Sequence, residues 1–145
     1  MRLNLDISKT IAVGVACIFL AQWGYGQGSK QSSATWQVPA EAAGMKNPYA
    51  KDAASIQKGS ALYLQTCAIC HGNKGKGDGI AAAGLPVLPA DHTSAKVQNE
   101  SDGALFWKLS TGRGNMPAYQ AVLTDEQRWA LVNYIRTLSK KKSTK

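Results

Sequence analysis

The sequence predicts an all-α protein built around one small helical domain. Three segments between residues 55 and 139 have apolar residues at spacings of three and four, which is the period of an α-helix. Loops rich in glycine and proline separate these segments, and none of them has the alternating pattern of a strand. The chain has 145 residues, of which 44% are hydrophobic and 18% are charged, so it can bury one compact core. The sequence has no internal repeat, which excludes solenoid and collagen-like proteins.

The first helix is expected to begin at Ser55, a residue type that caps helix N-termini. One face of this helix carries its core-facing residues at helical spacing: Ile56, Gly59, Leu62, Tyr63, Thr66 and Cys67. Gly72 supplies the stop signal directly after the sequence Cys-Ala-Ile-Cys-His. The first helix therefore ends at the most distinctive motif of the chain.

The second helix is expected between Ser101 and Gly112. Ser101 is a suitable N-cap, and Gly112 occupies the usual position of a C-terminal glycine. Asp102 in the first turn complements the positive end of the helix dipole. The apolar stripe of this helix consists of Leu105, Phe106 and Leu109.

The third helix is expected to begin at Thr124, because Thr124 and Gln127 have the spacing of a capping box. Asp125 and Glu126 place negative charge in the first turn, where the helix dipole favours it. Apolar residues then recur at helical spacing up to Ser139: Trp129, Val132, Ile135 and Leu138.

Residues 1–26 are expected to be a secretory signal peptide. Arg2 and Lys9 precede an apolar run over residues 11–21, and small residues follow it. This run is shorter than the roughly 20 residues that a membrane-spanning helix needs. We therefore expect cleavage before Gln27 and an exported, periplasmic protein. The alternatives are an uncleaved leader that anchors the protein and a lipid on Cys17, and either would associate the N-terminus with a membrane.

Three regions are expected after the leader. Residues 27–51 are rich in Gly, Ser, Ala and Gln and predict a flexible arm or linker. Residues 52–139 contain the helical segments and form the domain. Residues 140–145 form a basic tail.

Cys67, Cys70 and His71 form the motif C-x-x-C-H. On a helical turn, positions i, i+3 and i+4 project to the same side, so both thiols and the imidazole reach one object. Two cysteines at this spacing form thioethers with the two vinyl groups of a haem, while the adjacent histidine ligates the iron. The motif therefore predicts one covalently attached haem c with its iron.

Three other kinds of site use the same residues. A zinc site needs a fourth ligand, for which only His92 is available. A thioredoxin-like redox pair belongs to a βαβ unit that this sequence lacks. A structural disulfide between Cys67 and Cys70 fits an exported protein but gives His71 no role.

A haem iron held by His71 needs a sixth ligand, and the candidates are Met45, His92 and Met116. Met116 is the strongest, because it lies in a loop with two glycines that permit tight turns and is followed by Pro117. Met45 precedes the domain, and His92 lies in a loop where we expect a polar surface role. The predicted haem-binding residues are therefore Cys67, Cys70, His71 and Met116, of which His71 and Met116 ligate the iron.

Several further features accompany this motif. They are Gly59 and Tyr63 in the first helix, the glycine-rich run at residues 75–79, the sequence Gly-Arg-Gly-Asn-Met-Pro at residues 112–117, and Tyr-Ile-Arg-Thr-Leu at residues 134–138. With these features, the segment from about Asp52 to Leu138 resembles a monohaem class I cytochrome c. The resemblance implies a small helical bundle around one covalent haem.

In this bundle the first and last helices would cross closely at Gly59, with Tyr63, Trp129 and Tyr134 packed around the crossing. The resemblance also implies that a proline carbonyl orients His71. Pro86 and Pro89 are the candidates, and the sequence does not distinguish them.

Two ligands that both stay bound leave no open position on the iron for a substrate. We therefore expect an electron carrier, not an enzyme, that transfers one electron between periplasmic or membrane-bound respiratory partners. One alternative is a haem subunit of a larger membrane oxidoreductase complex, with the arm binding the complex. Another is a peroxidase or a sensor, which would require Met116 to detach.

The net charge of +8 suggests redox partners with acidic docking surfaces. Basic residues lie close to the haem motifs in the sequence: Lys74, Lys76, Lys96, Lys108 and Arg113. Nucleic acid is not an expected partner, because the protein is predicted to be exported and its basic residues are not interleaved with stacking aromatic residues.

Overall fold

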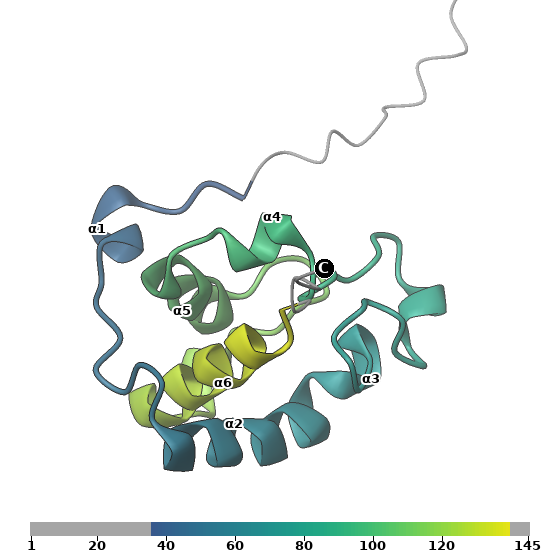
Figure 1. Ribbon diagram of the computed structural model, residues 1–145. Helices are drawn as coiled ribbons and strands as arrows, with labels where there is room; N and C mark the ends of the chain where they lie inside the picture. Colours follow the sequence, from purple (N-terminus) through teal and green to yellow (C-terminus); the bar gives the residue numbers. More distant parts are fainter. Residues whose placement is uncertain (1–35, 140–145) are drawn as a thin grey trace, which may run out of the picture. The chain divides into compact units, whose positions relative to one another are not determined.

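The computed structural model describes residues 36–139, and the predicted signal peptide and basic tail lie outside this range. The described part is helical and contains no strand (Figure 1). Its elements in chain order are α1 (Ala40–Ala43), α2 (Ala53–Thr66), α3 (Ala68–His71), η1 (Ala82–Gly84), α4 (Ala95–Gln98), α5 (Asp102–Thr111), η2 (Tyr119–Ala121) and α6 (Asp125–Thr137). The predicted all-α class is confirmed. Within the described range, no helix is both long and apolar enough to cross a lipid bilayer.

The centre of the fold is the crossing of α2 and α6 (Figure 1). Gly59 lies at the closest approach: a Cβ atom at this position would be 1.9 Å from the carbonyl oxygen of Ala130 and 3.0 Å from Cβ of Tyr134. Tyr63, one turn further along α2, is fully buried and its ring lies 5.1 Å from that of Tyr134. The close crossing predicted at Gly59 is therefore present.

The capping signals predicted two of the three long helices correctly. Ser101 accepts a hydrogen bond from Ala104 N–H at the start of α5, and Thr124 forms a capping box with Gln127 at the start of α6. The predicted N-cap of the first helix is wrong. Asp52 caps α2 by accepting a hydrogen bond from the backbone N–H of Ser55 at 2.6 Å. Its carboxylate reaches one of the unpaired amides of the first turn, so the helix begins earlier than expected.

Residues 37–51, the second half of the expected arm, contact the helical domain. Asn47 Nδ2 donates hydrogen bonds to Asp102 of α5 at 2.9 Å and to Asn133 of α6 at 2.7 Å. Asn133 in turn donates to the backbone carbonyl of Tyr49 at 2.6 Å. Part of this segment forms α1, which packs against α5. These polar contacts hold residues 47–49 at the junction of α5 and α6.

The core lies between α2, α5 and α6. Its buried residues are Tyr63, Cys67, Ala68, Val97, Leu105, Phe106, Leu109, Tyr119, Trp129, Leu131, Val132 and Ile135. Phe106 of α5 stacks on Trp129 of α6 with ring centroids 4.0 Å apart, and the guanidinium of Arg128 lies 4.6 Å from the centre of the Phe106 ring. Cys67, which follows the last residue of α2, belongs to this cluster, so the predicted haem-attachment motif begins at the edge of the core.

Candidate functional site

The motif Cys67-Ala-Ile-Cys70-His71 forms the short helix α3 at the end of α2. Backbone hydrogen bonds from Cys70 and His71 to the carbonyl of Cys67, at 3.1 and 2.9 Å, close the turn. Gly72 ends it with a φ of 78°, a left-handed conformation that suits glycine. The structure therefore brings the two thiols and the imidazole together on one helical turn, as predicted.

Both cysteines are free thiols. Cys67 is buried, its burial raises the pKa of its thiol, and Cys70 is partly exposed. The described residues also contain no group of three or more His, Cys, Asp or Glu side chains arranged to hold a metal ion. Both sulfur atoms are therefore available to bond to another group.

The ring of His71 is oriented by a backbone carbonyl. Its Nδ1 atom lies 2.9 Å from the carbonyl oxygen of Ala90. Because a carbonyl oxygen can only accept, Nδ1 carries the proton and Nε2 keeps its lone pair. Burial lowers the pKa of His71, and the hydrogen bond to Ala90 partly opposes this shift. The imidazole is therefore neutral, with Nε2 available as a metal ligand.

The expectation that Pro86 or Pro89 orients His71 is wrong, because the acceptor is Ala90. The reason is the path of the loop after the motif. His92 N–H donates a hydrogen bond to the carbonyl of Gly75 at 2.6 Å. This bond holds the end of the loop, near His92, against its beginning, near Gly75. With the loop in this position, the carbonyl that faces the imidazole is that of Ala90.

The expectation of a polar surface role for His92 is also wrong, since His92 is only 8% exposed. Its ring stacks on that of His71, with centroids 4.0 Å apart and an interplanar angle of 18°. Its Nδ1 atom shares a hydrogen bond with the Tyr63 hydroxyl at 3.0 Å. Burial, with a smaller contribution from His71, lowers the pKa of His92 to about 3, so this ring is also neutral. His92 therefore holds one face of the predicted iron ligand.

Met116 lies in a tight turn between α5 and η2. Arg113 and Met116 exchange two backbone hydrogen bonds, at 2.9 and 3.0 Å, around Gly114 and Asn115. Gly112 and Gly114 have φ values of 62° and 57°, which other residues rarely adopt. The glycines thus make the turn that the sequence predicted. The side chain of Met116 is half-buried and packs against the core cluster that includes Cys67.

Tyr119 connects this turn to the attachment motif. Its hydroxyl donates a hydrogen bond to the carbonyl of Thr66 at 3.0 Å, and Thr66 directly precedes Cys67. Burial raises the pKa of Tyr119 to about 12, so the hydroxyl stays protonated at neutral pH. The sequence analysis did not identify this residue. The only local signal was an aromatic side chain three positions after Met116.

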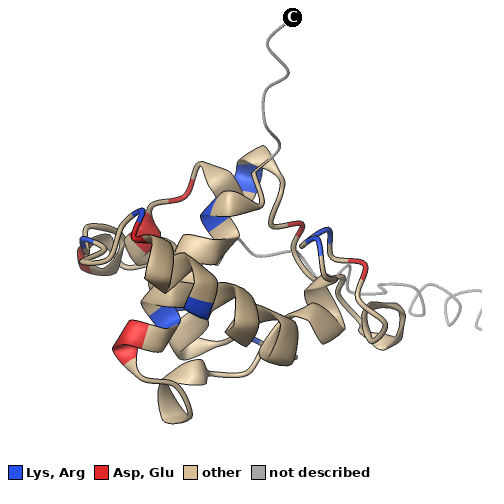
Figure 2. Cartoon of the chain, turned by 60° about the horizontal axis from the view of Figure 1, so that its bottom comes forward, with Lys and Arg blue, Asp and Glu red and all other residues tan. Residues whose placement is uncertain are grey.

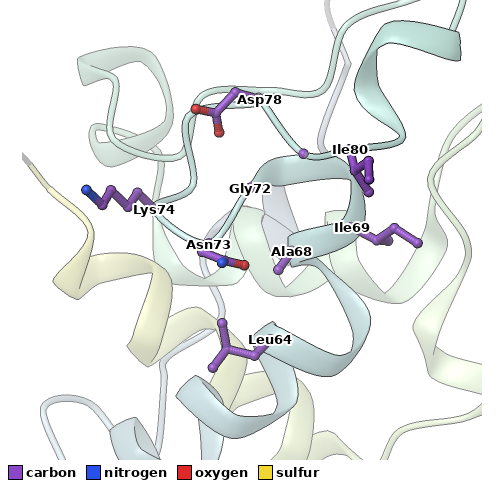
Figure 3. A pocket seen from close by; sticks show the side chains of 9 residues that line it. Leu64, Ala68, Ile69, Gly72, Asn73, Lys74, Asp78 and Ile80 are labelled. Atoms are coloured by element: carbon purple, nitrogen blue, oxygen red, sulfur yellow. The ribbon is translucent and has the colours of Figure 1, made fainter.

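A surface hollow of about 660 Å³ lies beside α3 (Figure 3). Ile69 and Ile80 lie on one side of it and Lys74 on the other. None of the four predicted haem-binding residues lines this hollow. The hollow therefore borders the outer surface of the attachment turn, through Ala68 and Ile69, without including the four side chains.

A sequence model of the protein family described as "Cytochrome C oxidase, cbb3-type, subunit III" matches residues 54–135. The chain belongs to this family of c-type cytochromes. The matched range runs from α2 to α6 and contains all four predicted haem-binding residues.

Two curated relatives match the cytochrome over 94 residues each. The cbb3-type cytochrome c oxidase subunit CcoP of Azospirillum brasilense is 32% identical, and the match covers 63% of this chain and 31% of the relative. Cytochrome c550 of Pseudomonas aeruginosa is 29% identical, with 64% and 62% covered. A chain of the Kuenenia stuttgartiensis reducing HAO-like protein complex superposes with a TM-score of 0.60 at 28% identity, and the match covers 68% of this chain and 49% of that one. The cytochrome thus spans less than two thirds of the length of each.

Membership of this family establishes that the protein carries covalently bound haem c with its iron. The residues of the motif fit such a group. Two unpaired thiols and an imidazole with a free Nε2 share one turn, and a thioether on a separate loop packs against the same core.

Proposed function

We propose that this cytochrome is a one-electron carrier in which Cys67 and Cys70 attach the haem and His71 and Met116 ligate its iron. When bound, the haem supplies a one-electron change between ferrous and ferric iron. The observation that carries the proposal is the hydrogen bond from His71 Nδ1 to Ala90, because it leaves Nε2 free on the turn that holds both thiols.

The two sides of the site have different functions in this proposal. On one side, Ala90 and His92 fix the direction and the tautomer of the His71 ring. On the other side, the turn at residues 112–117 presents the thioether of Met116. A soft thioether favours ferrous iron, so His/Met ligation gives a raised reduction potential. Because both ligands stay bound during electron transfer, no position is open for a substrate, and the protein acts as a carrier rather than an enzyme.

The test is the visible spectrum of protein produced together with haem-attachment machinery. The ferric wild-type protein is expected to show the weak far-red band that reports an iron–methionine bond. Met116→Ala should abolish this band, because it removes the thioether. Met45→Ala is the matched control, since Met45 is 42% exposed and should leave the band unchanged. A wild-type spectrum without the band, or a band that survives in Met116→Ala, would contradict the proposed ligation.

The proposal includes export from the cytoplasm and partners with acidic docking surfaces. Residues 36–139 carry ten basic and eight acidic side chains, and the two kinds are interspersed over the domain (Figure 2). Lys108 pairs with Glu100 at 2.5 Å, so its charge is largely neutralised locally. Lys74 and Lys76 follow His71 in the loop beside the hollow, and they are the basic residues we propose for docking.

Docking can be tested by electron-transfer rates with an acidic redox protein at increasing ionic strength. The rate should fall as salt screens the attraction. Replacing Lys74 and Lys76 by Gln together should lower the low-salt rate and flatten its salt dependence. The control replaces Lys46 and Lys51 by Gln, which removes the same charge from the segment before α2. Equal effects of the two double variants would reject the specific site.

One relative supports a second candidate function, that of a subunit in a larger oxidoreductase complex. CcoP is named as a subunit of a cbb3-type oxidase and is more than three times the length of the matched region, since the match covers 31% of it. Purification of the tagged full chain from membranes distinguishes the two functions. A stoichiometric oxidoreductase that co-purifies would indicate a subunit, and isolation of the cytochrome alone would indicate a free carrier.

A further inference from the structure

The turn that carries Met116 lies at the protein surface, and one buried side chain, that of Tyr119, follows it. Between residues 111 and 122, Tyr119 is the only buried residue, with 9% of its surface exposed. Gly114, Asn115 and Pro117, which surround Met116, are exposed. The two backbone hydrogen bonds between Arg113 and Met116 lie within the turn, so they can move with it as a unit.

Tyr119 reaches the end of the helix that carries the haem-attachment motif. Thr66 is the last residue of α2, where backbone carbonyls have no partner inside the helix. The Tyr119 hydroxyl donates to this carbonyl at 3.0 Å. One hydrogen bond therefore connects the Met116 turn to the residue that precedes Cys67.

We propose that Tyr119 is a positioning residue that latches the Met116 turn to the end of α2 and thereby limits displacement of Met116 by external ligands. This inference rests on the proposed ligation of the iron by Met116. It adds that a side chain which does not itself touch the iron controls the fraction of molecules in which Met116 is bound.

The reasoning is a population argument. An external ligand binds only when the Met116 turn has moved away, so its apparent affinity is the intrinsic affinity multiplied by the fraction of open molecules. Opening moves Tyr119 away from Thr66, so the hydrogen bond stabilises the closed form alone. Its removal should increase the open fraction about fivefold, which corresponds to about 1 kcal/mol for one partly buried hydrogen bond.

The experiment is a titration of the ferric holoprotein with imidazole, followed by loss of the far-red band. Tyr119→Phe keeps the ring in the core and removes only the hydroxyl. Without imidazole the variant should keep the band, and its apparent affinity for imidazole should rise about fivefold. At saturating imidazole the rate of binding equals the rate at which the turn opens. This rate should be at least as high in Tyr119→Phe as in the wild-type protein.

Tyr63→Phe is the matched control. It removes another buried hydroxyl, but one that bonds to His92 on the other side of the site. Both variants should lose similar stability in urea, whereas only Tyr119→Phe should bind imidazole more tightly. An unchanged affinity in Tyr119→Phe, or an equal increase in both variants, would overturn the latch. A wild-type protein without the far-red band would instead overturn Met116 ligation itself, and the latch with it.

Discussion

Substitution of Gly59 by Ala tests the helix crossing on which the site depends. The added Cβ atom would lie 1.9 Å from the carbonyl oxygen and 2.5 Å from the carbonyl carbon of Ala130. Carbon and oxygen atoms normally approach no closer than about 3.3 Å. The helices α2 and α6 would therefore have to separate locally by about 1.4 Å, in a region packed by Tyr63, Leu131 and Val132.

The expected cost is about 3 kcal/mol, at the upper end of the range for overpacking, because the clash is with backbone atoms that no side-chain rotation relieves. Helix propensity alone predicts the opposite sign, since alanine in a helix interior is favoured over glycine by up to about 1 kcal/mol. The sign of the change in the free energy of unfolding therefore distinguishes the clash at the crossing from the effect of helix propensity.

The assay is urea unfolding of the holoprotein, followed by far-ultraviolet circular dichroism. Gly84→Ala is the matched control, because a Cβ at that position meets no atom within 4 Å. The control should change the free energy of unfolding by less than about 0.5 kcal/mol. A Gly59→Ala protein as stable as wild type, or more stable, would refute the close crossing as the reason for glycine at this position.

Two further predictions concern buried polar groups. Asn133→Leu removes the hydrogen bonds of Asn133 to Tyr49, Ser55 and Asn47, so it should lower the free energy of unfolding in urea by about 3 kcal/mol. Asn99 is exposed, so the control Asn99→Leu should lower it by less than about 0.5 kcal/mol. Similar values for the two variants would contradict this role of Asn133. Burial raises the pKa of Tyr119 from 10.0 to about 12, so the unfolded chain releases this proton at a lower pH than the folded chain. Stability should therefore fall as pH rises from 10 toward 12, by up to about 1.4 kcal/mol per pH unit from this group, and Tyr119→Phe should show a shallower fall; identical slopes would contradict the shift.

Features that depend on neighbours in the sequence were predictable. The capping residues of α5 and α6, the glycines that form the Met116 turn and the one-sided arrangement of Cys67, Cys70 and His71 all follow from local spacing. The N-cap of α2 was not predictable, since Asp52 and Ser55 are both good capping residues and local spacing does not decide between them.

Features that depend on loop closure were not predictable. Ala90 is 19 residues from His71. The acceptor is its backbone carbonyl, which every residue type has, so the amino-acid sequence does not indicate it. His92 is buried because the returning loop packs it against His71 and Tyr63, although histidine in a polar loop is usually exposed. Likewise, no periodicity in residues 37–51 indicated that Asn47 would bond to both α5 and α6.

The hydrogen bond between His71 and Ala90 also means that the two ends of the haem-attachment motif are positioned by different parts of the chain. Cys67 and Cys70 are held by the helical turn of α3 itself, whose hydrogen bonds join residues three and four positions apart. The tautomer and direction of the imidazole, by contrast, are set by the Ala90 carbonyl, which lies 19 residues further along the chain. The direction of the axial ligand therefore depends on closure of the loop, and a substitution that shifts residues 73–92 should change the orientation of His71 without moving either attachment cysteine.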